Sequence, residues 1–126
     1  MNRVGFYGIS WGGGMGAHIP AVEDRLKLNI LVHGGFRSEP YEPHVDPINY
    51  LTRVKIPTLM LSGKYDFGFP VETNQLALFR LLRTPAAHKV RIPYDIGHQF
   101  LPTEFAKASL ACLEKYFGPV NPAPVN

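Results

Sequence analysis

Short apolar segments bounded by glycine or proline alternate along this chain with segments of helical periodicity, and this alternation constrains the fold more than any other feature. The apolar segments lie at residues 3–7, 27–33, 58–62 and 88–93. Most of their side chains are apolar on both faces, which is typical of buried parallel strands. The sequence therefore predicts an α/β fold built on four strands in a mostly parallel sheet.

Two longer segments have the periodicity of amphipathic helices. Residues 71–83 follow Pro70, and apolar side chains recur there at intervals of three. Residues 103–117 repeat the pattern and stop at Gly118, which a proline follows. Proline before a helix and glycine after it are the expected boundary signals. We therefore predict one helix over each segment.

The domain organisation is simple, because 126 residues suit a single domain. We predict one α/β domain over residues 1–117. Residues 118–126, "GPVNPAPVN", are predicted to form a disordered tail, and the Pro- and Gly-rich residues 34–47 a surface loop.

Charge and hydropathy exclude two classes of partner. The chain has 13 basic and 10 acidic residues, and the basic residues are scattered without any run. A nucleic-acid-binding surface needs basic residues clustered on one face, so we expect no nucleic-acid partner. No window approaches the roughly 20 apolar residues that span a bilayer, so we expect no membrane partner either.

Cysteine usage favours a reducing, cytoplasmic setting. Cys112 is the single cysteine, which excludes an intramolecular disulfide and a cysteine-based metal cluster. Its place at the apolar border of a predicted helix suggests a packed small hydrophobe.

The stretch "GFYGISWGG" lies where the first strand must turn sharply into a helix. Gly8-x-Ser10-x-Gly12 fits a nucleophile elbow, in which glycines on both sides remove Cβ atoms that would collide around a strained serine. A competing interpretation reads Gly12-x-Gly14-x-x-Ala17 as a dinucleotide fingerprint. That fingerprint requires an acidic residue at the end of the next strand, where this chain has "LVHGG". We therefore favour the elbow and expect no cofactor.

A serine nucleophile needs a base, and the base needs a carboxylate. Asp66 lies four residues beyond the third predicted strand, and His98 lies five residues beyond the fourth. Because the carboxyl ends of parallel strands meet at one sheet edge, we expect Ser10, Asp66 and His98 to converge there as a catalytic triad. The backbone N–H of Trp11 is then the expected first oxyanion donor, whether or not its side chain is a core aromatic.

Other acidic residues remain open as the third member of the triad. Asp46 and Glu72 are alternatives if Asp66 is only a turn residue, whereas Asp95 is too near His98 in sequence for an easy inward reach. The remaining histidines have no metal-ligand spacing such as H-E-x-x-H, so we expect packed or surface histidines and no metal site. They are His18, His33, His44 and His88.

With the elbow, the acid loop and the "GH" loop in this order, the chain resembles the α/β-hydrolase superfamily, particularly its dienelactone-hydrolase, acetylxylan-esterase and prolyl-oligopeptidase-like branches. The likeness covers residues 3–117, and residues 45–82 are similar to hydrolase modules that accompany a kinase domain in some bacterial proteins. It implies a three-layer sandwich and an esterase-type serine hydrolase. Such domains carry several strands before the elbow strand, and we expect this chain to lack them.

The expected substrate is a small, uncharged ester of a short acid. Phe67, Phe69 and Phe100 flank the proposed acid and base and are expected to wall an apolar pocket. The alternative is a catalytically weak or silent module that needs a partner chain or an N-terminal half to complete its site.

The predicted first strand also bears on assembly. As an edge strand it would expose unpaired backbone groups beside apolar side chains, and such edges recruit partners. We therefore expect a homo-oligomer.

Overall fold

The structure is a computed structural model that describes residues 3–119, so most of the predicted tail over 118–126 lies outside the described residues. All four predicted strands form and pair in parallel in the order β1-β2-β3-β4. They are β1 (Val4–Ile9), β2 (Leu26–Val32), β3 (Thr58–Gly63) and β4 (Lys89–Tyr94). The predicted α/β class and parallel sheet are confirmed.

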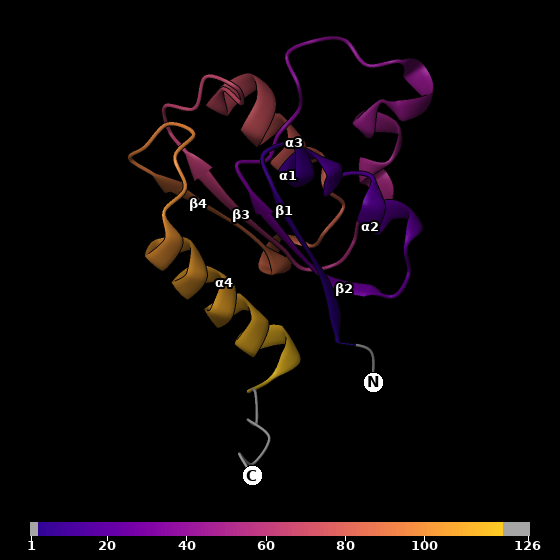
Figure 1. Cartoon of the computed structure of the whole chain (residues 1–126). Coiled ribbons are helices and arrows are strands. Elements are labelled where there is room, and N and C mark those ends of the chain that lie inside the picture. The colour runs from indigo at the N-terminus through magenta and orange to yellow at the C-terminus, as the bar shows by residue number, and fades with distance from the viewer. Residues whose placement is uncertain (1–2, 120–126) are drawn as a thin grey trace.

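Helices cover both faces of this sheet and produce a three-layer sandwich (Figure 1). The long α4 lies along one face, while α1, α2 and α3 lie on the other side. The helices are α1 (Trp11–Met15), α2 (Ile19–Val22), α3 (Leu76–Leu81) and α4 (Pro102–Phe117). None of the helices within residues 3–119 has the length and apolar character needed to cross a membrane.

The alternation of side chains along β2 and β3 divides the core into two halves. Leu28, Ile30 and Val32 face α4 and pack around Phe105, which is fully buried. Leu31 faces the opposite layer, where it packs with residues of α2, α3 and the segment before β3. Truncating a buried aromatic such as Phe105 to alanine typically costs about 3–5 kcal/mol, so this contact contributes strongly to holding α4 on the sheet.

The two outer strands are less buried than the central ones. Strand β3 is buried along its whole length, whereas β1 lies at one edge of the sheet, as expected, and is largely exposed. Strand β4, at the other edge, is only partly buried, which differs from the expectation of a buried strand. Val4, Tyr7 and Ile9 of β1 are each exposed by nearly half. An edge strand has a neighbour on one side only, so its side chains keep more contact with solvent.

The predicted helix over 71–83 is shorter than expected. It begins as a π-helical turn at Val71–Gln75, continues as α3 and ends when Leu82 becomes extended. Pro85 disfavours helical backbone at the residue before it, which opposes continuation of the helix. The predicted surface loop over 34–47 contains a 3₁₀ turn at Pro43–Val45, and another begins at Pro47.

Candidate active site

The turn between β1 and α1 holds Ser10 in a strained backbone conformation, with φ 59° and ψ −111°. The Ser10 N–H donates to the carbonyl of Val32 at 2.8 Å, which ties the turn to the end of β2. A Cβ on Gly8 would lie 2.1 Å from the carbonyl oxygen of Gly12, so only glycine fits there. The same expectation for Gly12 was wrong, because a Cβ at that position meets nothing within 4 Å outside its chain neighbours and its own helix.

The structure brings together the three side chains that the strand ends were predicted to place at one sheet edge. The Nε2 atom of His98 lies 2.8 Å from the Ser10 hydroxyl, and its Nδ1 atom lies 2.6 Å from Oδ2 of Asp66. Each residue follows a different strand: Ser10 follows β1, Asp66 follows β3 and His98 follows β4. A continuous hydrogen-bonded path therefore runs from the serine hydroxyl to a carboxylate.

Asp66 is buried and its orientation is set by backbone donors. Its Oδ1 atom accepts the N–H groups of Gly68 at 2.9 Å and Phe69 at 3.1 Å. This leaves Oδ2 for His98. An Nδ1–H donated to Asp66 leaves Nε2 of a neutral His98 unprotonated toward Ser10, which is the tautomer that a base requires.

The other acidic candidates have different partners. Asp46 accepts the N–H of Ile48 at 3.0 Å and caps a 3₁₀ turn, and Asp95 forms an exposed ion pair with Lys64 at 2.7 Å. Glu72 is exposed on the π-helical turn. Within residues 3–119, Asp66 is the acidic residue that pairs with His98.

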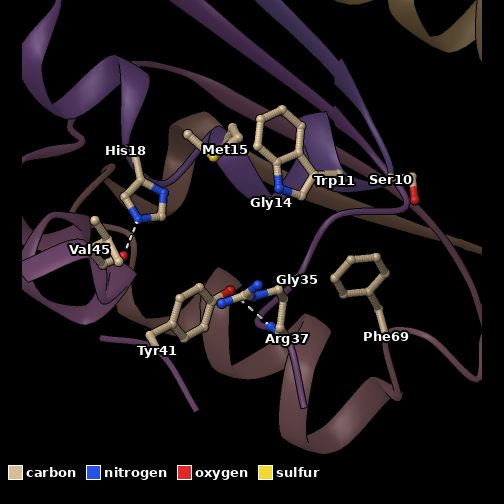
Figure 2. Close-up of a pocket in the computed structure, with 10 residues that line it drawn as sticks. All are labelled: Ser10, Trp11, Gly14, Met15, His18, Gly35, Arg37, Tyr41, Val45 and Phe69. Carbon is tan, nitrogen blue, oxygen red and sulfur yellow. Dashed lines mark hydrogen bonds between the residues drawn. The ribbon is translucent and has the colours of Figure 1, made fainter. Parts of the chain in front are cut away.

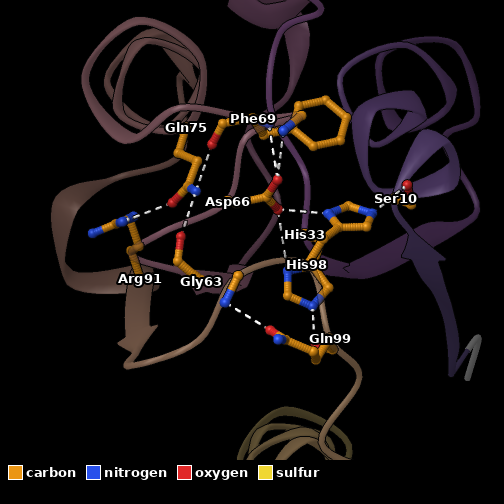
Figure 3. Close-up of polar contacts among 11 residues, drawn as sticks. Ser10, His33, Gly63, Asp66, Phe69, Gln75, Arg91, His98 and Gln99 are labelled. Carbon is orange, nitrogen blue, oxygen red and sulfur yellow. Dashed lines mark hydrogen bonds and ion pairs between the residues drawn. The ribbon is translucent and has the colours of Figure 1, made fainter.

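A second histidine lies against the same carboxylate, and sequence reasoning missed it. His33 directly follows β2, is 1% exposed and has a positive φ of 51°. Its Nδ1 atom is 3.5 Å from Oδ2 of Asp66, and its ring centroid is 4.7 Å from that of His98 (Figure 3). Burial lowers the pKa of His33 below its ordinary value. The available signal was its position, because "LVHGG" places it at the carboxyl edge of the sheet beside the predicted triad.

His33, Asp66 and His98 are also the described residues most suited by type to hold a metal, since one ligand atom from each lies within 4.8 Å of the others. Two ligands bound to one zinc ion at tetrahedral angles are separated by about 3.3 Å. The Asp66–His98 contact of 2.6 Å is instead a hydrogen-bond distance. The geometry therefore fits proton sharing better than metal ligation.

A cavity of about 360 Å³ opens beside Ser10 (Figure 2). Phe69 lines it as expected, and its ring stacks on His98 with centroids 6.0 Å apart. Phe67 and Phe100 do not line it, which corrects their expected role. Phe67 is 96% exposed, and Phe100 packs edge-on against Phe105 instead. Adjacent residues in an irregular loop can point in opposite directions, so nearness to Asp66 and His98 in sequence did not decide their orientation.

One wall of the cavity comes from the loop after β2, which the sequence predicted only as a surface loop. This wall comprises Gly35, Arg37, Tyr41 and Val45. The Arg37 guanidinium lies 4.3 Å from the centroid of the Tyr41 ring, and the Tyr41 hydroxyl accepts a hydrogen bond from the backbone N–H of Arg37 at 3.0 Å. Met15 and His18 complete the far end of the cavity. The loop follows a strand at the carboxyl edge of the sheet, which was the signal that it could reach the site.

Trp11 is the first residue of α1, so its N–H has no acceptor within the helix. It directly follows Ser10, where an N–H can face a negative oxygen that develops on a substrate held at the serine. The Trp11 side chain is 71% exposed and lines the cavity, so it is not a core aromatic.

Solved structures similar to this chain share its fold at low sequence identity. Acetyl xylan esterase from Paenibacillus sp. R4 matches with a TM-score of 0.75 at 24% identity, over 91% of this chain and 46% of that one. A cold-adapted esterase from an Arctic intertidal metagenomic library matches with a TM-score of 0.72 at 22% identity, over 89% of this chain and 48% of that one.

An acylaminoacyl peptidase matches with a TM-score of 0.74 at 18% identity, over 97% of this chain and 25% of that one. The chain spans about half the length, or less, of the structures it matches. No protein-family model and no curated protein sequence matches it.

Proposed function

We propose that this chain, which has the α/β-hydrolase fold, is a serine esterase that cleaves short-chain carboxylic esters. The observation that carries the proposal is the continuous contact from the Ser10 hydroxyl through His98 to the buried Asp66 carboxylate. A serine whose hydroxyl meets an oriented imidazole is an activated nucleophile.

In the first step Ser10 Oγ attacks the ester carbonyl carbon, while His98 Nε2 takes the hydroxyl proton. Asp66 then stabilises the positive charge on His98 and holds the ring in place. The carbonyl oxygen becomes negative in the tetrahedral intermediate, and the Trp11 N–H donates to it.

In the second step His98 returns the proton to the leaving alcohol, and the acyl group stays on Ser10. Water then attacks the acyl carbon while His98 takes one of its protons. The bond from the acyl carbon to Ser10 Oγ breaks, His98 returns the proton to Oγ, and the acid is released. The proton transfers use Ser10, His98 and Asp66, whose side chains lie within hydrogen-bond distance along this path.

The cavity beside Ser10 supports a short acyl group as the substrate. Its volume of about 360 Å³ is at the lower end of ligand pockets. Most lining side chains are apolar, but Arg37 adds one permanent positive charge to the wall. We propose an uncharged ester as the substrate. Because Arg37 is positively charged, esters whose acyl end carries a carboxylate are a second class of substrate to test.

A catalytically weak module is the second candidate, and a specific observation favours it. The β1–α1 turn supplies one oxyanion donor in the part of the chain that the structure describes, and loss of one such donor typically costs about 10²–10³ in rate.

The exposed edge of β1 supports a further proposal, that two copies of the chain associate through it. Val4, Tyr7 and Ile9 expose apolar surface beside unpaired backbone groups at this edge. Light scattering at tens of micromolar should give a dimer mass, and a stable monomer would contradict the proposal.

The experiment for the esterase proposal is labelling by a fluorophosphonate probe together with hydrolysis of p-nitrophenyl acetate. Ser10→Ala should abolish both signals. Ser109→Ala is the matched control, because Ser109 is buried on α4 away from the cavity and its hydroxyl has no hydrogen-bond partner among the described residues. Labelling without turnover would favour the weak module, and full turnover by folded Ser10→Ala would exclude the serine mechanism.

A further inference from the structure

We infer that His33 is a positioning residue for the triad, which holds His98 in register with Asp66 and Ser10. The inference rests on the proposed serine mechanism and adds a fourth residue to it. His33 does not touch the reacting atoms, so it acts through its neighbours.

The backbone at His33 is held in a conformation that a histidine rarely adopts. Its φ is 51°, a value that a residue other than glycine keeps only where the surrounding structure imposes it. The His33 N–H donates to the carbonyl of Leu61 at 2.8 Å, which ties it to β3. Since β2 lies between β1 and β3, this places His33 between the strands that present Ser10 and Asp66. Backbone strain of this kind is found mostly at functional sites, and His33 lies beside the proposed triad.

One nitrogen of His33 holds the loop that carries His98. Its Nε2 atom lies 2.7 Å from the carbonyl oxygen of Gln99, the residue after His98. A carbonyl oxygen only accepts, so Nε2 carries the proton and donates. This hydrogen bond joins the end of β2 to the loop after β4, which lies two strands away in the sheet.

The other nitrogen of His33, Nδ1, does not compete with His98 for the hydrogen bond to Asp66. With the proton on Nε2, a neutral His33 has no proton on Nδ1, which faces Oδ2 of Asp66 at 3.5 Å. His33 Nδ1 therefore cannot donate to that oxygen, and His98 is the histidine that donates to it, at 2.6 Å. Burial, which lowers the pKa of His33, favours this neutral form.

The His33 ring also limits where the His98 ring can move. The centroids of the His33 and His98 rings are 4.7 Å apart. The Phe105 ring, from α4, packs edge-on against His33 with centroids 5.4 Å apart. His98 is half-exposed and would otherwise turn its ring toward solvent. The charged or titratable groups that face His33 are Asp66 and His98.

Three substitutions separate these contributions. His33→Leu keeps bulk but removes the donor, His33→Gly removes both and relieves the positive φ, and His33→Gln restores a donor of similar reach. His88→Leu is the matched control, because His88 is exposed and pairs with Tyr116 on another part of the surface.

On p-nitrophenyl acetate we expect His33→Leu and His33→Gly to lower kcat about tenfold with KM unchanged, which is the fold-change for one misplaced hydrogen-bonded group. His33→Gln should recover most of kcat, and His88→Leu should keep all of it. Equal kcat in wild type and folded His33→Gly or His33→Leu would overturn the inference.

A readout independent of activity separates this inference from the esterase proposal. The proton on Nδ1 of His98, shared with Asp66, should give a far-downfield NMR resonance in the wild type and in His33→Gln. It should broaden or disappear in His33→Leu and His33→Gly. If the wild type shows the resonance but no turnover, the esterase proposal fails while the positioning role stands. If the resonance is unchanged in all three variants, the positioning role fails.

Discussion

The two sides of the cavity beside Ser10 are built differently. On the triad side, Asp66 is buried, accepts two backbone N–H groups and contacts a histidine at 2.6 Å. On the opposite side, Arg37 lies on an exposed loop and meets Tyr41 through a ring face and one hydrogen bond. Groups tied to strand ends can keep a fixed geometry for chemistry, whereas a surface loop tolerates change. The two sides of the cavity should therefore respond differently to substitution.

The largest effect is expected on the triad side, from Asp66→Asn. An amide there removes the charge and can favour the wrong tautomer of His98, so kcat for p-nitrophenyl acetate should fall about 10³–10⁴-fold. Asp46→Asn is the control, because Asp46 caps a 3₁₀ turn. If Asp46→Asn were the damaging change and Asp66→Asn harmless, the assignment of the acid would be wrong.

The next effect tests how tightly the elbow is packed. Gly8→Ala places a Cβ 2.1 Å from the Gly12 carbonyl oxygen, so the backbone must shift and the free energy of unfolding should fall by about 1–3 kcal/mol. Gly12→Ala meets open space and lies in α1, so its stability should be unchanged or slightly higher.

Urea unfolding of both glycine variants measures the difference directly. Equal losses in the two variants would mean that the elbow is not constrained by the close approach of Gly8 and Gly12.

A smaller effect is expected on the pH dependence of the free energy of unfolding, through the titration of His33. Because burial lowers its pKa from 6.5, the unfolded chain binds the proton more readily than the folded chain. The contribution of neutral His33 to stability is therefore fully present above pH 6.5, and it is lost as the pH falls from 6.5 through the pKa of His33 in the folded chain. His33→Gln should remove this part of the pH dependence. Parallel curves of unfolding free energy against pH for the two proteins would contradict the assignment.

The smallest effect is expected on the loop side. Arg37→Ala should leave kcat on neutral p-nitrophenyl acetate within about twofold, because Arg37 interacts with Tyr41 and the triad is held by other contacts. For an ester whose acyl end carries a carboxylate, KM should rise about fivefold, since an exposed ion pair is worth up to about 1 kcal/mol.

Arg53→Ala is the control for this substitution, because Arg53 lies over Tyr50 and does not line the cavity. A large loss of kcat on the neutral ester in Arg37→Ala would show that the two sides of the cavity are not separable.

Much of the triad side could be predicted because its information is local in the sequence. Ser10 lies at a glycine-bounded turn after an apolar run, and Asp66 and His98 follow apolar runs at short intervals. When those runs form parallel strands, their carboxyl ends lie at one edge of the sheet. The short loops that follow the strands then stay close to this edge. The order of the elements therefore determined which loops meet.

Orientation within those loops was decided only by the tertiary structure. Phe67 and Phe69 lie two residues apart, yet one is 96% exposed and the other packs against His98. The difference arises where Asp66 Oδ1 draws the N–H groups of Gly68 and Phe69 inward, a contact that no periodicity encodes.

The alternation of apolar and helical segments by itself determined the layers of this protein, because burying apolar surface on both faces of a sheet leaves few arrangements. It also determined that a serine, an acid and a histidine follow strands at one edge. Only the packed structure decided that His33 lies against the carboxylate that His98 binds and that Arg37 and Tyr41 wall the cavity. These contacts join residues far apart in the chain, and their geometry depends on how the strands and loops pack in three dimensions.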